Sequence, residues 1–150
     1  MTDSSVYLDT ALFIYFLEKS SLYFERARSF FIKCRNNSVP LVTSAVTVEE
    51  YCVYPLSQGN NQAVSDFEAF LQGMNIKIVP ADKAVALEAA KLRAKYNGFK
   101  ALDAIHLATA ITSGCSAFIT NDKQLRQTQE ISIYTMENLE AFQTEEEDEK

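Results

Sequence analysis

The chain has 150 residues, of which 47% are hydrophobic and 23% charged, with only four glycines and three prolines. This length suits one domain, and this composition excludes a low-complexity or disordered body. The apolar runs are too short to cross a bilayer, and no basic segment precedes an apolar run near residue 1. We therefore expect neither a membrane span nor a secretory signal.

The formal net charge of −6 is concentrated at the end of the chain. Residues 145–150 hold five acids and one base, which leaves 15 of the 20 acids and 13 of the 14 bases, a net charge of −2. We expect residues 1–144 to form a single domain and residues 145–150 a disordered acidic tail. Because nucleic-acid-binding domains are usually strongly basic, this balance argues against tight, non-specific RNA binding.

The three cysteines, Cys34, Cys52 and Cys115, are widely spaced and include no C-x-x-C pair. An odd, scattered set predicts neither a disulfide framework nor a structural zinc site, and it is typical of proteins in a reducing cytoplasm. We therefore expect a cytoplasmic protein.

Short β-branched and aromatic runs alternate with helical patterns along the chain. Strands are expected at 6–8, 40–43, 76–79, 117–120 and 131–134, and helices at 10–19, 21–37, 47–57, 62–73, 82–96 and 101–113. Asp82 is the expected N-cap of the fifth helix. The alternation predicts an α/β fold, a three-layer α/β/α sandwich with a mostly parallel central sheet of about five strands.

Four acidic residues fall at the junctions between these elements. Asp9 ends the first strand, and Glu50 lies in the first turn of the helix after the second strand. Asp103 opens the last helix, and Asp122 follows the fourth strand. Because ligands bind outside the carboxyl ends of the strands in an open parallel sheet, we expect these acids to converge at one edge.

Each acid also has a purely structural alternative. Asp9 and Asp103 could cap the helices that follow them, and Asp122 could belong to an ordinary turn. Thr47-x-x-Glu50 matches a capping box. Considered one at a time, most of these acids fit the structural role, but their shared position favours a common site.

Convergence of the four carboxylates would have a specific consequence. Carboxylates in one pocket repel one another unless a cation compensates them. Ligation by oxygen alone suits Mg²⁺ or Mn²⁺ rather than Zn²⁺. Two such ions about 3.5–4 Å apart can position a hydroxide and stabilise the leaving oxygen of an in-line displacement. The acids therefore predict hydrolysis of a phosphodiester bond.

The same residues lie in four motifs between residues 6 and 122, namely V-Y-L-D-T, S-A-V-T-V-E-E-Y, L-D-A-I-H-L-A-T-A and I-T-N-D. In this order and spacing they resemble the motifs of PIN-domain ribonucleases, most closely the VapC-type toxins of toxin–antitoxin pairs, and the resemblance runs from about residue 6 to residue 134. By spacing, Glu50 rather than Glu49 matches the acid of the second motif. The expected domain at 1–144 is thus a PIN-like nuclease domain.

The resemblance implies that four acids are catalytic and hold Mg²⁺ or Mn²⁺, namely Asp9, Glu50, Asp103 and Asp122. It implies that the hydroxyls of Thr10 and Thr120 line the site. It also implies an endoribonuclease that acts on RNA with water as the nucleophile, and a toxin that forms a homodimer and binds an antitoxin protein.

Six basic residues flank the third and fourth acids and form a candidate RNA-contacting set: Lys91, Arg93, Lys95, Lys100, Lys123 and Arg126. A solvated helix face explains them equally well. The only histidine, His106, follows Asp103 by three residues and could share its helical face. A lone histidine in such a helix is more often a core or surface residue than a ligand.

The alternative function is a catalytically weak or inactive PIN-like domain that acts as a scaffold or partner-binding module. Seven aromatic residues fall near the first two helices: Phe13, Tyr15, Phe16, Tyr23, Phe24, Phe30 and Phe31. They could simply cover the sheet, or they could line an apolar groove for an amphipathic helix of a partner. In a toxin that partner would be the antitoxin, reaching a cation into the acidic pocket.

Overall fold

The computed structural model describes residues 5–144. Its sheet is five-stranded and wholly parallel, in the order β3-β2-β1-β4-β5. The strands are β1 (Val6–Leu8), β2 (Leu41–Ser44), β3 (Lys77–Val79), β4 (Ala117–Thr120) and β5 (Ser132–Thr135). The helices are α1 (Thr10–Leu17), α2 (Phe24–Asn36), α3 (Ala45–Ser57), α4 (Asn61–Gly73), α5 (Lys83–Lys95) and α6 (Ala101–Thr112), with two short 3-10 helices, η1 (Lys123–Gln127) and η2 (Leu139–Ala141).

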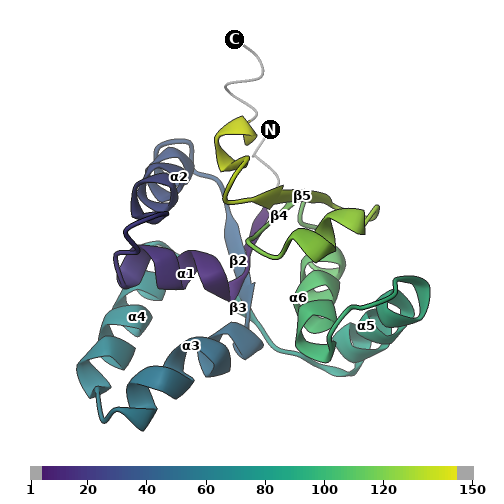
Figure 1. Ribbon diagram of the computed structural model, residues 1–150, viewed down its shortest axis with the longest axis horizontal. Coiled ribbons are helices and arrows are strands. Elements are labelled where there is room, and N and C mark those ends of the chain that lie inside the picture. The colour runs from purple at the N-terminus through teal and green to yellow at the C-terminus, as the bar shows by residue number, and fades with distance from the viewer. Residues whose placement is uncertain (1–4, 145–150) are drawn as a thin grey trace.

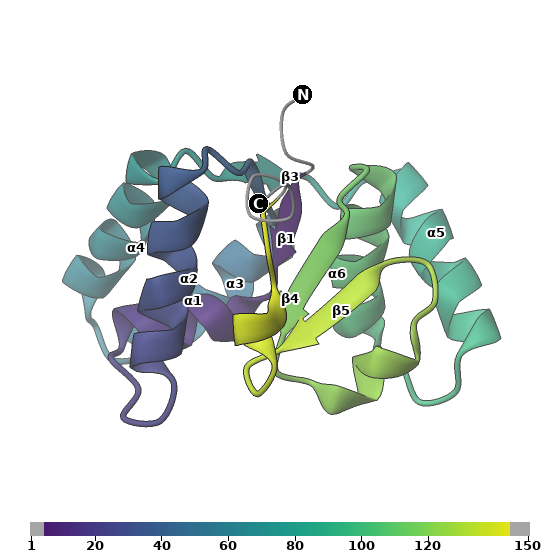
Figure 2. The same cartoon turned by 90° about the horizontal axis from the view of Figure 1, so that it is seen from above.

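The helices cover both faces of the sheet. Helices α1 to α4 lie on one side, and α5 and α6 lie on the other (Figures 1 and 2). The predicted three-layer α/β/α sandwich is therefore confirmed. The predicted acidic tail at 145–150 lies outside the described residues, and the domain boundary at residue 144 stays a prediction. None of the helices within residues 5–144 is long and apolar enough to cross a membrane.

The alternation of side chains along the central strands creates two separate cores. In β1, Val6 and Leu8 pack under α1 to α4, whereas Tyr7 packs under α5 and α6. In β4, Phe118 lies on the same side as Tyr7, and the two rings stack with their centroids 5.0 Å apart. Because both faces are covered, these strands can be apolar throughout, as parallel strands usually are.

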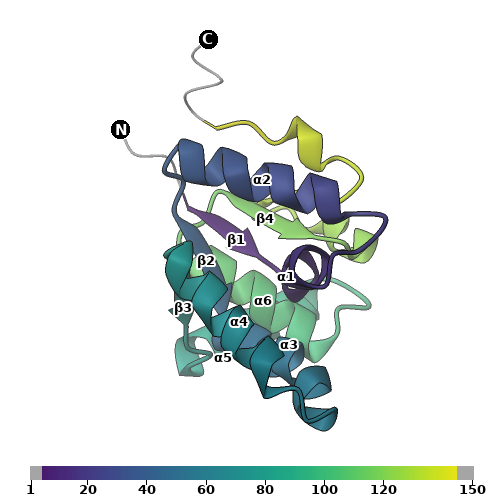
Figure 3. The same ribbon diagram turned by 90° about the vertical axis from the view of Figure 1, so that its left-hand side faces the viewer.

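The core under α1 to α4 is rich in aromatic rings. Phe13 of α1 is fully buried and lies 5.6 Å, centroid to centroid, from Phe67 of α4. Helices α3 and α4 lie side by side (Figure 3), and Tyr51 of α3 stacks on the same Phe67 ring with the two centroids 4.2 Å apart. Phe30 and Phe31 of α2 are also buried. Three of the seven rings that the sequence placed near the first two helices are therefore buried in this core, and Tyr15, Phe16, Tyr23 and Phe24 remain partly exposed.

The start of α3 differs from the sequence prediction. The helix begins at Ala45 rather than residue 47, because the Ser44 hydroxyl accepts a hydrogen bond from the Val46 amide at 3.0 Å and caps it. Thr47 lies inside the helix, where its hydroxyl bonds to that of Thr43 at 2.7 Å. The capping-box interpretation is therefore wrong, and Glu50 lies beyond the first turn.

The other helix ends lie within three residues of their predicted positions. Asp82 caps α5 as expected, since its carboxylate accepts a hydrogen bond from the Val85 amide at 3.0 Å. Helix α2 begins at Phe24, three residues later than predicted, and α1 ends at Leu17, two residues earlier. Both differences fall in the turn between α1 and α2, where Lys19 adopts a left-handed conformation with φ of 53°.

Candidate active site

The four acids lie where the sequence placed them relative to the strands. Asp9 follows β1, and its carboxylate caps α1. Asp122 follows β4 and caps η1 through a 3.0 Å bond from the Gln124 amide. For these two residues the capping alternative is correct, and it coexists with a place in the site. Asp103 lies in the first turn of α6 and does not cap it, because the N-cap is Lys100.

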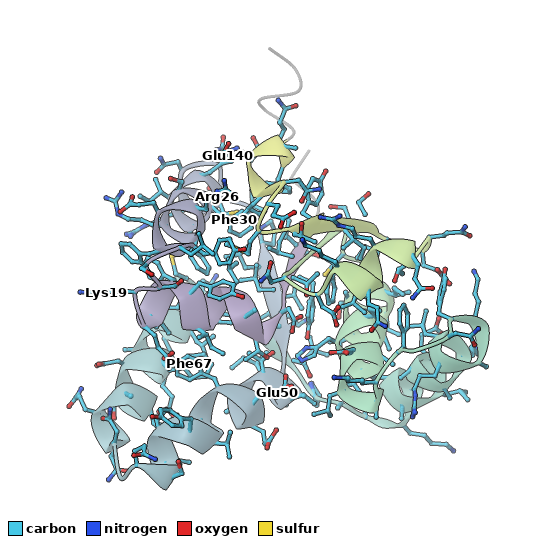
Figure 4. All side chains as sticks on the ribbon, viewed as in Figure 1. Lys19, Arg26, Phe30, Glu50, Phe67 and Glu140 are labelled. Atoms are coloured by element: carbon cyan, nitrogen blue, oxygen red, sulfur yellow. The ribbon has the colours of Figure 1, made fainter. Side chains whose placement is uncertain are left out.

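Three of the acids, Asp9, Glu50 and Asp122, line one open pocket at the carboxyl ends of β1 and β4. Glu50 reaches this place from the inner end of α3, near the centre of the molecule (Figure 4). The wall of the pocket is completed by Thr10, Ala11, Ile14, Tyr15, Thr120 and Asn121. Chain segments that are more than a hundred residues apart therefore meet at one edge of the sheet.

Hydroxyl groups hold two of these carboxylates in place. One oxygen of Asp9, Oδ1, accepts a hydrogen bond from the Thr10 amide at 2.7 Å, and the other, Oδ2, accepts one from the Thr120 hydroxyl at 2.7 Å. The Thr10 hydroxyl donates to Oε1 of Glu50 at 2.8 Å. The Thr120 oxygen also accepts from the Asp122 amide at 3.1 Å. The two threonines thus connect three of the four acids.

The site also contains a residue that the sequence analysis set aside. His106 is buried, with 1% of its surface exposed, and its Nε2 lies 2.6 Å from Oε1 of Glu50 and 3.5 Å from Oδ1 of Asp9. Its Nδ1 lies 2.6 Å from the hydroxyl oxygen of buried Tyr7. The signal available in the sequence was its spacing of three residues from Asp103 on a helix, which puts both on one helical face.

The electrostatics of the acids differ from one residue to the next. The hydrogen bond from His106, with one from Thr10, holds the pKa of Glu50 below its ordinary value despite its partial burial. Burial raises the pKa of Asp103, and the negative charges of Asp122, Asp9 and Glu50 raise it further. Asp103 is therefore close enough to the other three acids to feel their charge, although it does not line the pocket. The site is crowded with negative charge around Asp103.

Burial disfavours the charged form of the His106 imidazole, but the hydrogen bond to Glu50 and the charge of Asp9 outweigh it. The pKa of His106 is consequently raised above its ordinary value. Because its pKa is raised, the imidazole favours its charged form, which pairs with the carboxylates. The charged form leaves no unprotonated ring nitrogen to bind a metal.

The donor set fits a hard divalent cation. Ligand atoms of Asp9, Glu50 and His106 lie within 4.8 Å of one another. Carboxylate oxygens are the preferred ligands of Mg²⁺ and Mn²⁺. Burial and then the charges of neighbouring acids raise the pKa of Asp103, and a bound cation would relieve the repulsion among these charges. The residues of this pocket therefore suit the binding of Mg²⁺ or Mn²⁺.

Four of the six basic residues singled out for RNA contact form ion pairs with nearby acids: Lys91 with Glu88 at 3.8 Å, Lys95 with Glu130 at 3.2 Å, Lys123 with Glu137 at 2.7 Å and Arg126 with Glu137 at 3.8 Å. Arg93 and Lys100 form no ion pair within residues 5–144. Ion pairs on the surface are weak, so an anionic ligand can exchange with them.

The fold and the pocket define a class: a three-layer α/β domain with an acidic site at the carboxyl edge of a parallel sheet. A family model described as "PIN domain" matches residues 6–131. The chain belongs to the PIN domain family. No curated protein matches it at a significant level.

Solved structures share the same fold at low sequence identity. A chain of DNA-bound VapBC from Salmonella typhimurium is 18% identical, with a TM-score of 0.72 over 91% of this chain and 99% of that one. A chain of VapBC2 from Rickettsia felis, bound to a promoter DNA fragment, is 15% identical with a TM-score of 0.67 over 87% and 97%. VapC20 of Mycobacterium tuberculosis, described as a toxin that cleaves the sarcin-ricin loop, is 12% identical with a TM-score of 0.63 over 76% and 87%.

Proposed function

We propose that this PIN domain is a metal-dependent endoribonuclease that hydrolyses phosphodiester bonds of RNA and is the toxin of a toxin–antitoxin pair. The observation that carries this proposal is the meeting of Asp9, Glu50 and Asp122 in one pocket, with the charge of Asp103 close by. Helix capping accounts for Asp9 and Asp122 one at a time, but it does not explain why their charges lie close to those of Glu50 and Asp103, which they repel. A site that binds cations and phosphate explains them.

In this proposal Asp9, Glu50, Asp103 and Asp122 hold Mg²⁺ or Mn²⁺. When bound, the ion polarises the phosphoryl oxygen and makes hydroxide available near neutral pH. The protein contributes orientation, since Thr10 and Thr120 fix the carboxylates of Glu50 and Asp9 through bonds of 2.8 and 2.7 Å. Because these bonds fix the two carboxylates, the site is organised to receive a cation.

RNA is the proposed substrate, and its phosphates would be met by the six basic residues named above. Lys100 is the most direct candidate, since it is the N-cap of α6 and therefore lies one turn before Asp103. Lys123 directly follows Asp122 at the edge of the pocket. The paired cations would exchange their carboxylate partners for phosphates, so we expect binding that weakens strongly with salt.

The experiment that tests this function is cleavage of a mixed RNA pool by the purified protein. The reaction is run with Mg²⁺, with Mn²⁺, with EDTA and with an Asp103→Asn variant. Cleavage that requires the metal and is lost in the variant is the expected result. RNA that stays intact in every reaction, with no metal binding by calorimetry, contradicts the nuclease and favours a partner-binding module instead.

An antitoxin is the proposed protein partner. An apolar groove between α1, α2 and α4 is lined mainly by Phe16, Leu17, Phe31, Ile32, Phe70 and Met74. Arg28, Arg35 and Asp66 add charges to its walls. Such a groove suits an amphipathic helix that inserts its apolar face. Growth arrest on expression of this chain, relieved by a short protein encoded next to it and by Asp9→Asn, would support the toxin assignment.

A homodimer is proposed as the assembly of the free protein. Val53, Tyr54 and Leu56 at the end of α3 are 55–66% exposed, and exposed apolar side chains that lie together favour association. Analytical ultracentrifugation tests this proposal. A strict monomer at high concentration would contradict it, and so would a dimer unaffected by charged substitutions at Val53 and Leu56.

A further inference from the structure

A buried chain of hydrogen bonds leads from the centre of β1 into the acidic pocket. Tyr7 has none of its surface exposed, and its hydroxyl oxygen lies 2.6 Å from Nδ1 of His106. The Nε2 of the same ring lies 2.6 Å from Oε1 of Glu50. The bond between Tyr7 and His106 is buried and that between His106 and Glu50 is partly buried, so both are stronger than they would be on the surface.

The distances fix where the ring carries a proton. A carboxylate oxygen can approach a ring nitrogen to 2.6 Å only when a hydrogen lies between them, because two bare lone pairs would repel. A hydrogen therefore lies between the two atoms. Because the pKa of Glu50 is held below its ordinary value, its carboxyl is ionised and the hydrogen belongs to Nε2 of His106, whether the ring is neutral or charged. A neutral ring accepts the Tyr7 hydroxyl proton at Nδ1, and a charged ring donates from Nδ1 to the Tyr7 oxygen. In both states Tyr7 prevents the ring from turning over.

The bond to His106 determines which oxygen of Glu50 remains open. Oε1 accepts from both Thr10, at 2.8 Å, and His106, at 2.6 Å. Oε2 accepts no hydrogen bond within residues 5–144. The same Nε2 also lies 3.5 Å from Oδ1 of Asp9, so the donor sits between two carboxylates that would otherwise repel each other.

We propose that His106, held by Tyr7, is a positioning residue that donates through Nε2–H to Glu50 and thereby presents Oε2 of Glu50 to the divalent cation. His106 is not itself a ligand, since its Nε2 is occupied by the proton. This inference rests on the proposed metal site, and it adds the residues that prepare that site. Partners that orient a metal ligand typically change metal affinity or activity by about 10–100-fold when they are removed.

The first test uses the fact that the chain contains a single histidine. In protein labelled with ¹⁵N-histidine, a long-range ¹H–¹⁵N spectrum reports the protonation of both nitrogens of His106 without assignment. We expect Nε2 to be protonated in the metal-free protein and to remain so when the protein is saturated with Mg²⁺. Loss of that proton on adding Mg²⁺ would make His106 a ligand and overturn the proposal.

The second test measures Mn²⁺ affinity by calorimetry in three variants. His106→Leu removes the donor, and we expect it to weaken Mn²⁺ binding by about 10–100-fold. His106→Gln can supply an N–H near the position of Nε2 and should recover most of that affinity. Tyr7→Phe keeps both rings and removes only the hydroxyl, so it tests the same chain of bonds if the His106 variants fail to fold. For Tyr7→Phe we expect Mn²⁺ affinity to fall by a few-fold and the ¹⁵N spectrum to show a second orientation of the His106 ring.

The matched control is Glu49→Gln, because Glu49 is the exposed neighbour of Glu50 and lies outside this chain of bonds. Mn²⁺ affinity that is the same in folded His106→Leu, Tyr7→Phe and wild-type protein would overturn the positioning role. RNA that stays intact with a wild-type protein that binds Mn²⁺ would instead count against the ribonuclease. The two failures are distinguishable, because the tests of His106 measure metal binding and protonation and do not use RNA.

Discussion

The acidic site has two halves that are built differently. Around Asp9 and Glu50, three carboxylate oxygens accept hydrogen bonds from Thr10, Thr120 or His106, all of which are buried. Around Asp103, the surroundings are mainly other acids, and the pKa of its carboxyl is raised by burial and by their charges. The first half is organised by hydrogen bonds within the protein. In the second half, the negative charges of Asp122, Asp9 and Glu50 outweigh the opposing charge of His106.

This difference indicates how the two halves respond to a cation. In the organised half, the hydrogen bonds lower the pKa of Glu50, so the carboxylate is ready to bind before a metal arrives. In the crowded half, the metal-free protein carries unfavourable repulsion that a divalent ion would remove. The organised half should therefore set the geometry of the site, and the crowded half should make its stability sensitive to metal.

The largest effect is expected in the organised half. Glu50→Gln removes a charge from the proposed metal site while keeping the size of the side chain. We expect RNA cleavage to fall by about 10²- to 10³-fold, the loss typical of removing one preorganised electrostatic contact from an active site. Glu49→Gln, one residue earlier on α3 and exposed, should leave the cleavage rate unchanged. Equal rates for the two variants would show that Glu50 has no place in catalysis.

The next largest expected effect is a rise in Tm when metal binds to the site. A ligand that binds only the folded state at 100 times its Kd stabilises it by about 2.7 kcal/mol. For a chain of this length that corresponds to a rise of about 5–10 °C in Tm. Differential scanning calorimetry with Mn²⁺ and then with excess EDTA measures it. A Tm that is the same in both conditions would contradict a metal site at this edge of the sheet.

A smaller effect is expected from breaking the link between Asp9 and Asp122. The Thr120 hydroxyl donates to Asp9 and accepts from the Asp122 amide, so Thr120→Val breaks both contacts with little change in shape. We expect a loss of about 1 kcal/mol for each bond in urea denaturation. Thr120→Ser keeps the hydroxyl and is the control for the bonds themselves. Similar losses in both variants would attribute the effect to packing of the methyl group.

The smallest expected effect is a gain in stability rather than a loss. Asp103→Asn removes a charge that its neighbours repel, so the metal-free protein should become more stable at neutral pH. The gain should stay below about 1 kcal/mol, because the half-buried carboxyl is screened by solvent. Since the folded-state pKa of Asp103 is raised, the destabilisation begins above the unfolded pKa, grows as the pH rises to the folded pKa, and is complete above that value. The two proteins should therefore be equally stable below the unfolded pKa of about 4, as urea denaturation against pH would show. A variant less stable than wild type at neutral pH would contradict the crowding.

The sequence was sufficient to predict the sheet, because each strand is a short apolar run and each helix has its own periodicity. The start of α3 was wrong because Ser44 and Thr47 both suit an N-cap, and only the end of β2 decides between them. The four acids were identified because each lies near a junction between a strand or loop and the next element. Their different surroundings could not be predicted, because those depend on which side chains the fold brings together.

His106 shows the limit most clearly. Its spacing from Asp103 put both on one face of α6, but its real partners are Glu50 and Tyr7, 56 and 99 residues away in the chain. Tyr7 in turn looked like one more apolar residue in the run of β1. A polar role for these two residues follows only from the pairing of β1 with β2 and β4 and the docking of α3 against α6.

The wide separation of the site residues along the chain also has a consequence for synthesis. The bond between Glu50 and His106 spans 56 residues, and it needs α6 to have formed on one face of the sheet and α3 on the other. The bond between Thr120 and Asp9 spans 111 residues and needs β4 to be inserted beside β1. A growing chain therefore lacks an assembled site until almost all of this domain has left the ribosome and folded. Such late assembly would protect a cell that makes this protein from cleavage by unfinished copies.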